Sequence, residues 1–128
     1  MKNKSNVFIW VLAACLILGG LMPLVSAEVN MPKTIIHHVT LKWKAGCTDA
    51  DKAKVISDLK AILSEVQGVR NFWAKSTKVQ PQDYSQTFVI EFENDAALKA
   101  YAAHPKKKAW NDFYYSIRET SYNSVTTN

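Results

Sequence analysis

Few side chains in this sequence could do chemistry, and two of them stand among apolar neighbours. His37 lies in an alternating apolar segment, and Tyr101 lies in a short segment of helical composition. A neutral imidazole can exchange a proton near pH 7, and a phenol can donate a hydrogen bond. Because polar groups in apolar surroundings need a partner, both residues are candidates for a ligand site or for acid–base catalysis.

The spacing of the histidines argues against a metal site. His37 and His38 are adjacent in a predicted strand, so their rings point to opposite faces and cannot readily share one ion. His104 precedes Pro105 at the end of a predicted helix, where contact with the last helical carbonyls is the usual role. No acidic pair accompanies the histidines at a ligand spacing. We therefore expect no metal and no other cofactor.

Cys47 and the basic run at 106–108 are the remaining candidates. Cys47 has no paired base nearby in the sequence, so we expect either a small buried group or a free thiol. Lys106, Lys107 and Lys108 follow a helix break, where such a run usually forms a solvated face. The alternative is that this cluster attracts an anionic lipid head or a carboxylate.

The first 27 residues have the composition of an export signal. Lys2 and Lys4 form a basic start, an apolar run follows, and Val25-Ser26-Ala27 supplies the small residues of a cleavage site. A retained membrane anchor is disfavoured, because glycines and a proline interrupt the run and no basic cluster follows it. A lipoprotein signal with acylated Cys15 is the alternative. We expect an exported protein, periplasmic or secreted, with no membrane contact after cleavage.

The expected mature chain, residues 28–128, has the size of one domain. The formal charge of +5 becomes +3 without the two lysines of the signal, while all eleven acidic residues remain. So small a charge indicates neither a nucleic-acid partner nor a polyanion. The signal contains Cys15, so after cleavage Cys47 has no cysteine with which to form an intramolecular disulfide.

Hydrophobic periodicity predicts strands and helices in a definite order. A polar leader at 28–33 precedes an alternating strand at 34–43. A helix then begins after Thr48, with Asp51 as its capping-box partner, and Gly68 is placed to end it. Further strands are expected at 69–79, 84–93 and 119–126, and helical segments at 95–103, after the cap residue Asn94, and at 106–116.

The resulting order, β-α-β-β-α-β, is that of a ferredoxin-like α+β subunit with an antiparallel sheet and its helices on one face. Residues 34–126 form this predicted domain. Both faces of its strands carry bulky groups, such as Ile36 beside His37. A single layer of helices covers one face only, so we expect a homodimer joined through the sheets.

Side chains that share strand and helix faces predict an apolar pocket with a few polar groups, the usual composition of a small-molecule site. The predicted lining is His37, Val39, Leu41, Val55, Ile56, Leu59, Phe88, Ile90, Phe92, Tyr101 and Trp110. For the aliphatic members the alternative is a core that fills the space between sheet and helices. For His37 and Tyr101 a role in lining a ligand pocket and a role in filling the core are equally supported.

Segments spread over the whole domain resemble one known family. IIHHVTLKWKAG at 35–46, GVRNFW at 68–73 and FVIEFENDAALKAYAAHP at 88–105 are similar, in order and spacing, to the Dabb family of stress-responsive dimeric α/β-barrel proteins. The resemblance covers 34–125. It implies two ferredoxin-like subunits whose sheets close into a barrel, which agrees with the uncovered sheet face.

The resemblance also implies which residues would matter in an enzyme. In the family's plant polyketide cyclase, which makes olivetolic acid, a His after the second helix is the general base and a Tyr in that helix assists it. The Tyr corresponds to Tyr101, the His of the opening strand to His37, and the first His of the HP-x-H pattern to His104. The catalytic His corresponds to Lys107. A lysine with its ordinary pKa of about 10 mostly cannot act as a base at pH 7 unless burial lowers that pKa.

Three functions therefore stand as alternatives. The first is an exported dimer that binds a small apolar or aromatic molecule without catalysis. The second is a cyclase- or monooxygenase-like enzyme for an aromatic substrate, with Tyr101 and His37 as its catalytic residues. The third is a structural, stress-protective dimer whose own side chains fill the pocket.

Overall fold

The computed structural model describes residues 28–128, and the predicted export signal, with Cys15, lies outside the described residues. Within 28–128 the chain forms four strands and three helices. Their order is β1 (Ile35–Trp43), α2 (Asp49–Ser64), β2 (Val69–Trp73), β3 (Gln86–Phe92), α3 (Asp95–Ala102), α4 (Lys107–Ile117) and β4 (Arg118–Thr126).

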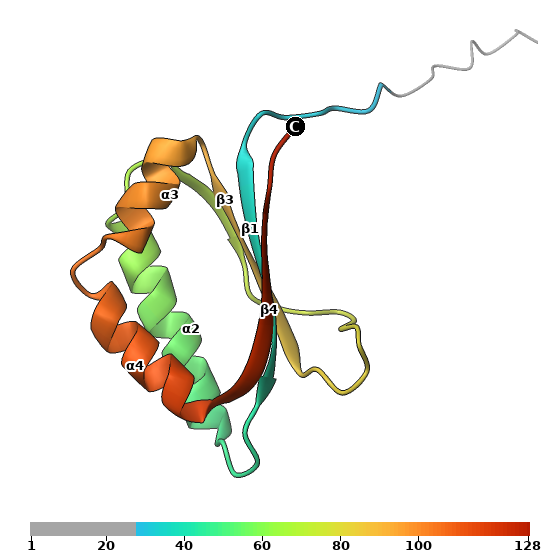
Figure 1. Ribbon diagram of the computed structural model, residues 1–128, viewed down its shortest axis with the longest axis vertical. Helices are drawn as coiled ribbons and strands as arrows, with labels where there is room; N and C mark the ends of the chain where they lie inside the picture. Colours follow the sequence, from blue (N-terminus) through green and yellow to red (C-terminus); the bar gives the residue numbers. More distant parts are fainter. Residues whose placement is uncertain (1–27) are drawn as a thin grey trace, which may run out of the picture. The chain divides into compact units, whose positions relative to one another are not determined.

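The strands form one antiparallel sheet in the order β2-β3-β1-β4. β1 is central and pairs with β3 on one side and with β4 on the other. All three helices lie on the same side of this sheet, and no helix of the described chain covers the other side (Figure 1). The ferredoxin-like α+β subunit predicted from the sequence is confirmed.

The two predicted helix caps, Thr48 and Asn94, are also confirmed. The hydroxyl of Thr48 accepts a hydrogen bond from the backbone N–H of Asp51 at 3.1 Å, and the Asp51 carboxylate accepts one from the Thr48 N–H at 3.1 Å. The side chain of Asn94 accepts from the N–H of Ala97 at 3.0 Å. Each cap satisfies a backbone donor that the first helical turn leaves without a partner.

Most element ends lie within two residues of the prediction, and two differences affect how β2 is formed. β2 stops at Trp73 instead of 79, because side chains take over the hydrogen bonds beyond it: the Ser76 hydroxyl bonds both backbone groups of Thr87. α2 ends at Ser64, four residues before Gly68. Gly68 instead forms the turn into β2, with a positive φ of 88° and a carbonyl that accepts from the Glu93 N–H at 2.7 Å.

The hydrophobic core lies between the sheet and the helices. It combines alternate residues of the two central strands with the stripe of α2 and the inner face of α4. Its members include Val39, Leu41, Val55, Leu59, Ile62, Phe88, Ile90, Phe92, Trp110 and Tyr114. The indole N–H of Trp110 donates to the carbonyl of Val55 at 2.9 Å, which holds α4 against α2.

The side of the sheet without helices carries large aromatic groups. Trp73 is 51% exposed and Tyr122 is 65% exposed. By strand register both lie on the same side as Val89 and Thr40, opposite the core. Tyr84 packs on Tyr122 with ring centroids 5.3 Å apart. This sheet face is therefore partly apolar and open to solvent in one subunit.

Gly68 and Gly46 allow a matched stability test, because both have a positive φ and only one is crowded. A Cβ at Gly68 would lie 2.8 Å from the Cβ of Ala97, whereas a Cβ at Gly46 would meet nothing within 4 Å. We expect Gly68→Ala to lower the free energy of unfolding by about 2–4 kcal/mol, from left-handed backbone strain plus overpacking.

Gly46→Ala bears the backbone strain alone and should cost about 1–2 kcal/mol. The measurement is urea denaturation at one fixed protein concentration, since assembly would shift the apparent stability. Equal losses in the two variants would contradict the close approach of α3 to Gly68.

Candidate functional site

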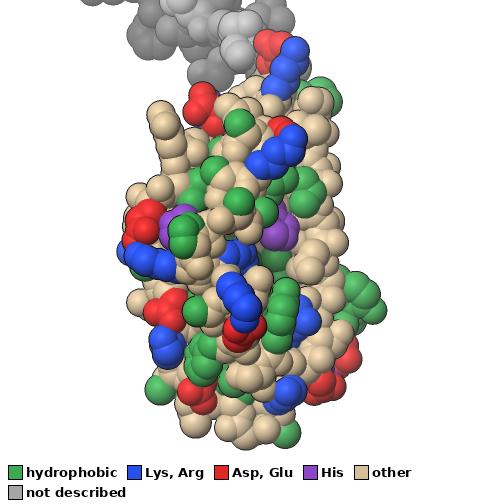
Figure 2. Space-filling model, turned by 60° about the vertical axis from the view of Figure 1, so that its left-hand side comes forward, with side chains coloured by type: hydrophobic (Ala, Val, Ile, Leu, Met, Phe, Trp, Pro, Cys, Tyr) green, Lys and Arg blue, Asp and Glu red, His purple; other side chains and the backbone are tan. Residues whose placement is uncertain are grey.

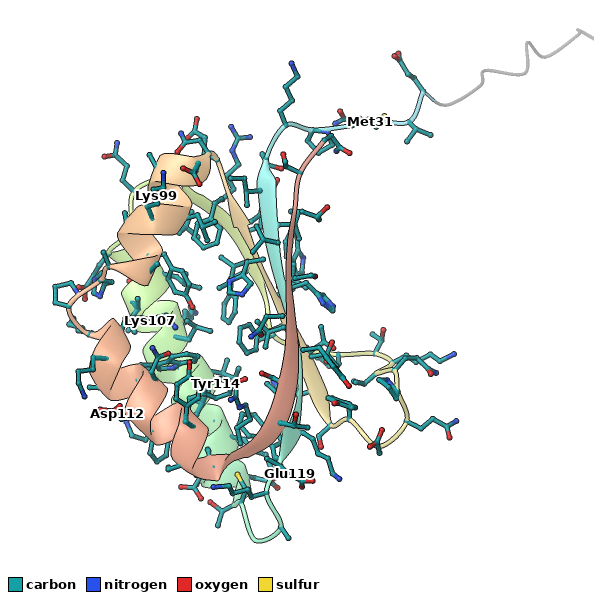
Figure 3. All side chains as sticks on the ribbon, viewed as in Figure 1. Met31, Lys99, Lys107, Asp112, Tyr114 and Glu119 are labelled. Carbon is teal, nitrogen blue, oxygen red and sulfur yellow. The ribbon has the colours of Figure 1, made fainter. Side chains whose placement is uncertain are left out.

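A cavity of about 80 Å³ lies between the inner face of the sheet and the helices α3 and α4. The sheet contributes His37 and Val39 from β1, Phe88 from β3 and Asn123 from β4. The helices and the residue after α4 contribute Tyr101, Lys107, Trp110, Asn111, Tyr114, Tyr115 and Arg118. Figure 3 shows Lys107 and Tyr114 on the side of α4 that faces the sheet.

Helical spacing explains why Lys107 faces inward. Lys107, Trp110 and Tyr114 are three and four residues apart in α4, so they share the face of the helix that packs on the sheet. Their neighbours point outward, where Lys106 contacts Glu65 and the Lys108 amine lies 2.7 Å from the Asp112 carboxylate.

The expectation that 106–108 forms a solvated face is therefore wrong for Lys107. Three lysines in a row share one charge, but α4 begins at Lys107, and successive residues of a helix point in different directions. The spacing from Lys107 to Trp110 and Tyr114 was the available signal. It assigns Lys107 to the apolar face while leaving Lys106 and Lys108 on the surface.

The amino group of Lys107 is held against two aromatic rings. Its Nζ lies 3.9 Å from the centre of the Trp110 ring and 4.7 Å from that of Tyr101. It donates one hydrogen bond to the side-chain oxygen of Asn111 at 3.1 Å. Within residues 28–128 no carboxylate forms an ion pair with it. Burial lowers the pKa of Lys107 to about 8, so a neutral amine is present near physiological pH.

His37 faces the same space from the sheet. Burial lowers its pKa, and the charges of Lys107 and His38 act in the same direction, so the imidazole is neutral at pH 7. Its ring meets Tyr101 edge-on, with centroids 6.3 Å apart. Burial raises the pKa of Tyr101, which keeps the phenol protonated. The site thus holds a neutral imidazole and a neutral phenol.

Three buried polar atoms around the cavity make no hydrogen bond of good geometry, although the Tyr114 hydroxyl lies near the side chains of Arg118 and Ser121. They are Nδ1 of His37, the hydroxyl of Tyr114 and Nε of Arg118, and within residues 28–128 the only other buried side-chain atom of this kind is in Thr34. The Arg118 guanidinium lies 5.0 Å from the Tyr114 ring centre, and its Nη1 donates to the Ser121 hydroxyl at 2.6 Å. Because buried polar groups are usually paired, their concentration here indicates a place for a polar ligand group.

A larger groove of about 520 Å³ lies between α2 and α4, but the charged side chains that line it are already paired. The Lys54 amine lies 2.5 Å from the Asp58 carboxylate, and Lys106 is paired with Glu65. Its remaining walls are side chains such as Ala61 and Phe113. The smaller cavity beside Lys107 is the better candidate, because its polar groups are the ones without partners.

The predicted pocket residues fall into two groups in the structure. His37, Val39, Phe88, Tyr101 and Trp110 line the cavity. Leu41, Val55, Leu59, Ile90 and Phe92 are fully buried in the core, and Ile56 packs against it partly buried. The predicted lining did not include Asn111, Tyr114, Tyr115, Arg118 and Asn123, and Lys107 was named only as the residue in place of the family's catalytic His.

The other chemically capable residues lie away from the cavity. Cys47 is a free thiol, partly buried against the core. The backbone N–H of His104 donates to the carbonyl of Tyr101 in the last turn of α3 at 3.3 Å, the expected kind of contact. The His104 ring lies outside the cavity, with Nδ1 accepting from the Lys106 N–H and Nε2 3.3 Å from Glu65. In the described chain no cluster of three His, Cys, Asp or Glu could hold a metal ion. Likewise, no helix within 28–128 has the length and apolar character to cross a membrane.

Comparison with known proteins places these features in a family. A family model described as the stress responsive A/B barrel domain, Dabb, matches residues 35–123. A Dabb family protein with a ferredoxin-like fold from Mesorhizobium loti is 26% identical, with a TM-score of 0.63 over 74% of this chain and 96% of the other. No curated protein sequence gave a significant match.

Two more distant structures share the fold. A dimeric ferredoxin-like protein of unknown function from Thermobifida fusca is 14% identical, with a TM-score of 0.64 over 80% of this chain and 99% of the other. A mutant of SnoaB, a cofactor-independent oxygenase from Streptomyces nogalater, is 12% identical, with a TM-score of 0.63 over 75% and 93%. At these identities the likeness extends to the fold alone.

The half-buried position of Lys107 predicts an unusual titration. We expect its amino group to titrate with a pKa of about 8, because burial disfavours the ammonium form. The neighbouring Lys108 is the control, since its contact with the Asp112 carboxylate raises its pKa above the ordinary value. The measurement is an NMR titration of the Lys side-chain carbons between pH 6 and 11, assigned with Lys107→Met. Titration of Lys107 together with the surface lysines would contradict its inward placement.

Proposed function

This chain belongs to the Dabb family of stress responsive A/B barrel domain proteins, and on that basis we propose that it is an exported homodimer that binds a small aromatic molecule. The binding site is the cavity beside Lys107. The observation that carries this proposal is the group of three unpartnered polar atoms, from His37, Tyr114 and Arg118, around one space with aromatic walls.

The walls of the cavity suit a flat ring. Trp110 and Tyr114 are stacked with centroids 4.8 Å apart, and Phe88 meets Tyr114 edge-on at 6.4 Å. Aromatic walls favour an aromatic ligand through offset-stacked and edge contacts. A volume of about 80 Å³ is small beside an ordinary drug pocket, so the enclosed part takes one ring or the end of a longer molecule.

The proposed dimer forms through the uncovered side of the sheet. Trp73 and Tyr122 are half or more exposed there in one subunit, and a second sheet would bury them. The Thermobifida fusca protein of the same fold is described as dimeric, which supports this arrangement. Two sheets packed face to face would give the barrel that the family name describes.

Catalysis is the second candidate function, and the environment of Lys107 favours it. An amine with a pKa of about 8 can serve as a general base, which an ordinary lysine cannot do efficiently at pH 7. In such an enzyme Lys107 takes a proton from the substrate, and Tyr101 donates a hydrogen bond to the substrate. Neutral His37 orients the substrate or passes the proton on. The reaction would be proton transfer on an aromatic or polyketide-type substrate, as in a cyclase- or monooxygenase-like enzyme.

The first test is native mass spectrometry of the protein purified gently from its natural host. We expect a dimer that carries a reproducible small-molecule adduct. Asn123→Phe should remove the adduct and keep the dimer, because it places a ring in the cavity mouth from an exposed strand position. Ala102→Phe, on the exposed surface of α3, should change neither the adduct nor the dimer.

An empty dimer would favour the structural, stress-protective alternative over ligand binding. A monomer would contradict the barrel.

Tyr122→Glu tests the interface directly, because it places a charge on the uncovered side of the sheet. We expect it to shift the sedimentation of the protein from that of a dimer to that of a monomer. Ala102→Glu adds the same charge on the helical side and should leave the dimer intact.

The export signal predicts a defined start of the mature protein. Intact-mass measurement of protein from the periplasm or the medium should give a chain that begins at Glu28, following cleavage after Ala27. A lipid-modified chain that begins at Cys15 would identify the lipoprotein alternative. A mass that still includes Met1 would contradict processing.

A further inference from the structure

We infer that the ligand of this cavity is a small aromatic acid whose carboxylate lies against the amino group of Lys107. This inference rests on the proposed ligand-binding function and adds the chemical class of the ligand. It follows from how charge is distributed around the cavity.

The lysines around α4 differ in one respect. Lys106 and Lys108 both meet carboxylates on the surface, those of Glu65 and Asp112. Lys107 lies between them in sequence, is more buried than either, and within residues 28–128 meets no carboxylate. A half-buried ammonium without a counter-ion is costly, and ring faces with one amide bond offset that cost only in part.

A second cation stands at the far end of the aromatic wall. Lys107 lies over Trp110, Arg118 lies over Tyr114, and these two rings are stacked on each other. Nε of Arg118 has no hydrogen-bond partner. The two positive groups therefore lie at opposite ends of one stack of two rings. A ligand ring would meet the edges of this stack and the rings of Phe88 and Tyr101, with its acidic group toward Lys107.

The cavity lining contains no Asp or Glu to neutralise these cations. Figure 2 shows that acidic and basic side chains are intermixed over the helix-bearing surface, so the outside offers no comparable excess of one sign. Neutral His37 and the phenols Tyr101 and Tyr114 add hydrogen-bonding groups without adding negative charge. A carboxylate is the group that this lining lacks and that Lys and Arg recognise most strongly.

Benzoate is the smallest probe with the required features, and benzamide is its neutral counterpart of nearly the same shape. We expect NMR titration of the purified protein at pH 7 to give at least tenfold tighter binding of benzoate than of benzamide. The shifted signals should be those of cavity residues such as His37 and Asn123. Acetate, which has the charge without the ring, should bind more weakly than benzoate.

Variants separate the charge of Lys107 from general electrostatics. Lys107→Met should weaken benzoate binding at least tenfold and should weaken benzamide binding much less, so that the preference for benzoate is lost. Lys108→Met removes the same charge one residue away on the surface and should leave the binding of benzoate and of benzamide unchanged. Lys107→Arg keeps the positive charge and should retain the preference for benzoate, and native-like spectra of each variant show that the fold is intact.

The outcomes distinguish this inference from the function on which it rests. Equal binding of benzoate and benzamide, insensitive to Lys107→Met, would overturn the acidic ligand and leave the aromatic pocket standing. Equal losses from Lys107→Met and Lys108→Met would also overturn it, since net charge alone would then explain the preference. No shift of any cavity residue with either probe would overturn the pocket and the inference together.

Discussion

The register of α4 is the constraint on which the candidate site depends. The indole of Trp110 reaches across to the carbonyl of Val55 in a buried hydrogen bond of 2.9 Å, and Tyr114 packs one turn later against Phe88. These two contacts fix which side of α4 faces the sheet, and that side includes Lys107. A helix rotated by one residue would bring Lys106 or Lys108 inward and would bury a different charge beside His37. The position of the amine is thus decided by aromatic packing and by one hydrogen bond to α2.

The same packing separates core from cavity along each element. In β1, Leu41 is buried in the core, Val39 is buried at the border of core and cavity, and His37, two residues before Val39 on the same face, lines the cavity. In α4, Trp110 and Tyr114 pack while Lys107 lies at the open end of their face. Polar side chains therefore replace apolar ones where the apolar layer ends, and they come from different elements that converge on one space. Such convergence is unfavourable for stability by itself, because each group loses water without gaining a full set of partners.

Much of the fold followed from the sequence because its determinants are local. Thr48 and Asp51 form their capping box within four residues, and the alternation in β1 needs only its own strand to be recognised. The candidate site was harder, because its members meet only through tertiary structure. His37 and Tyr101 stood out as polar groups among apolar ones. Lys107 was identified only through the resemblance, because by composition it belongs to a run of three lysines, and Arg118 lay just before the strand predicted to begin at 119. Its role depends on the rings of Tyr114 and Tyr115, which a pattern of hydrophobic positions does not place.

A lysine at this place has consequences that a histidine would not have. An imidazole can be buried neutral at little cost, as the lowered pKa of His37 illustrates. An ammonium remains largely charged even with a pKa of about 8, so the cavity carries positive charge at pH 7. That charge attracts an anion in the ground state, whereas proton abstraction needs the minor neutral form. Binding and catalysis thus make opposite demands on the same amine, and an anionic ligand, by stabilising the ammonium, would favour binding. The geometry around Lys107 therefore supports a binding protein more strongly than a general-base enzyme.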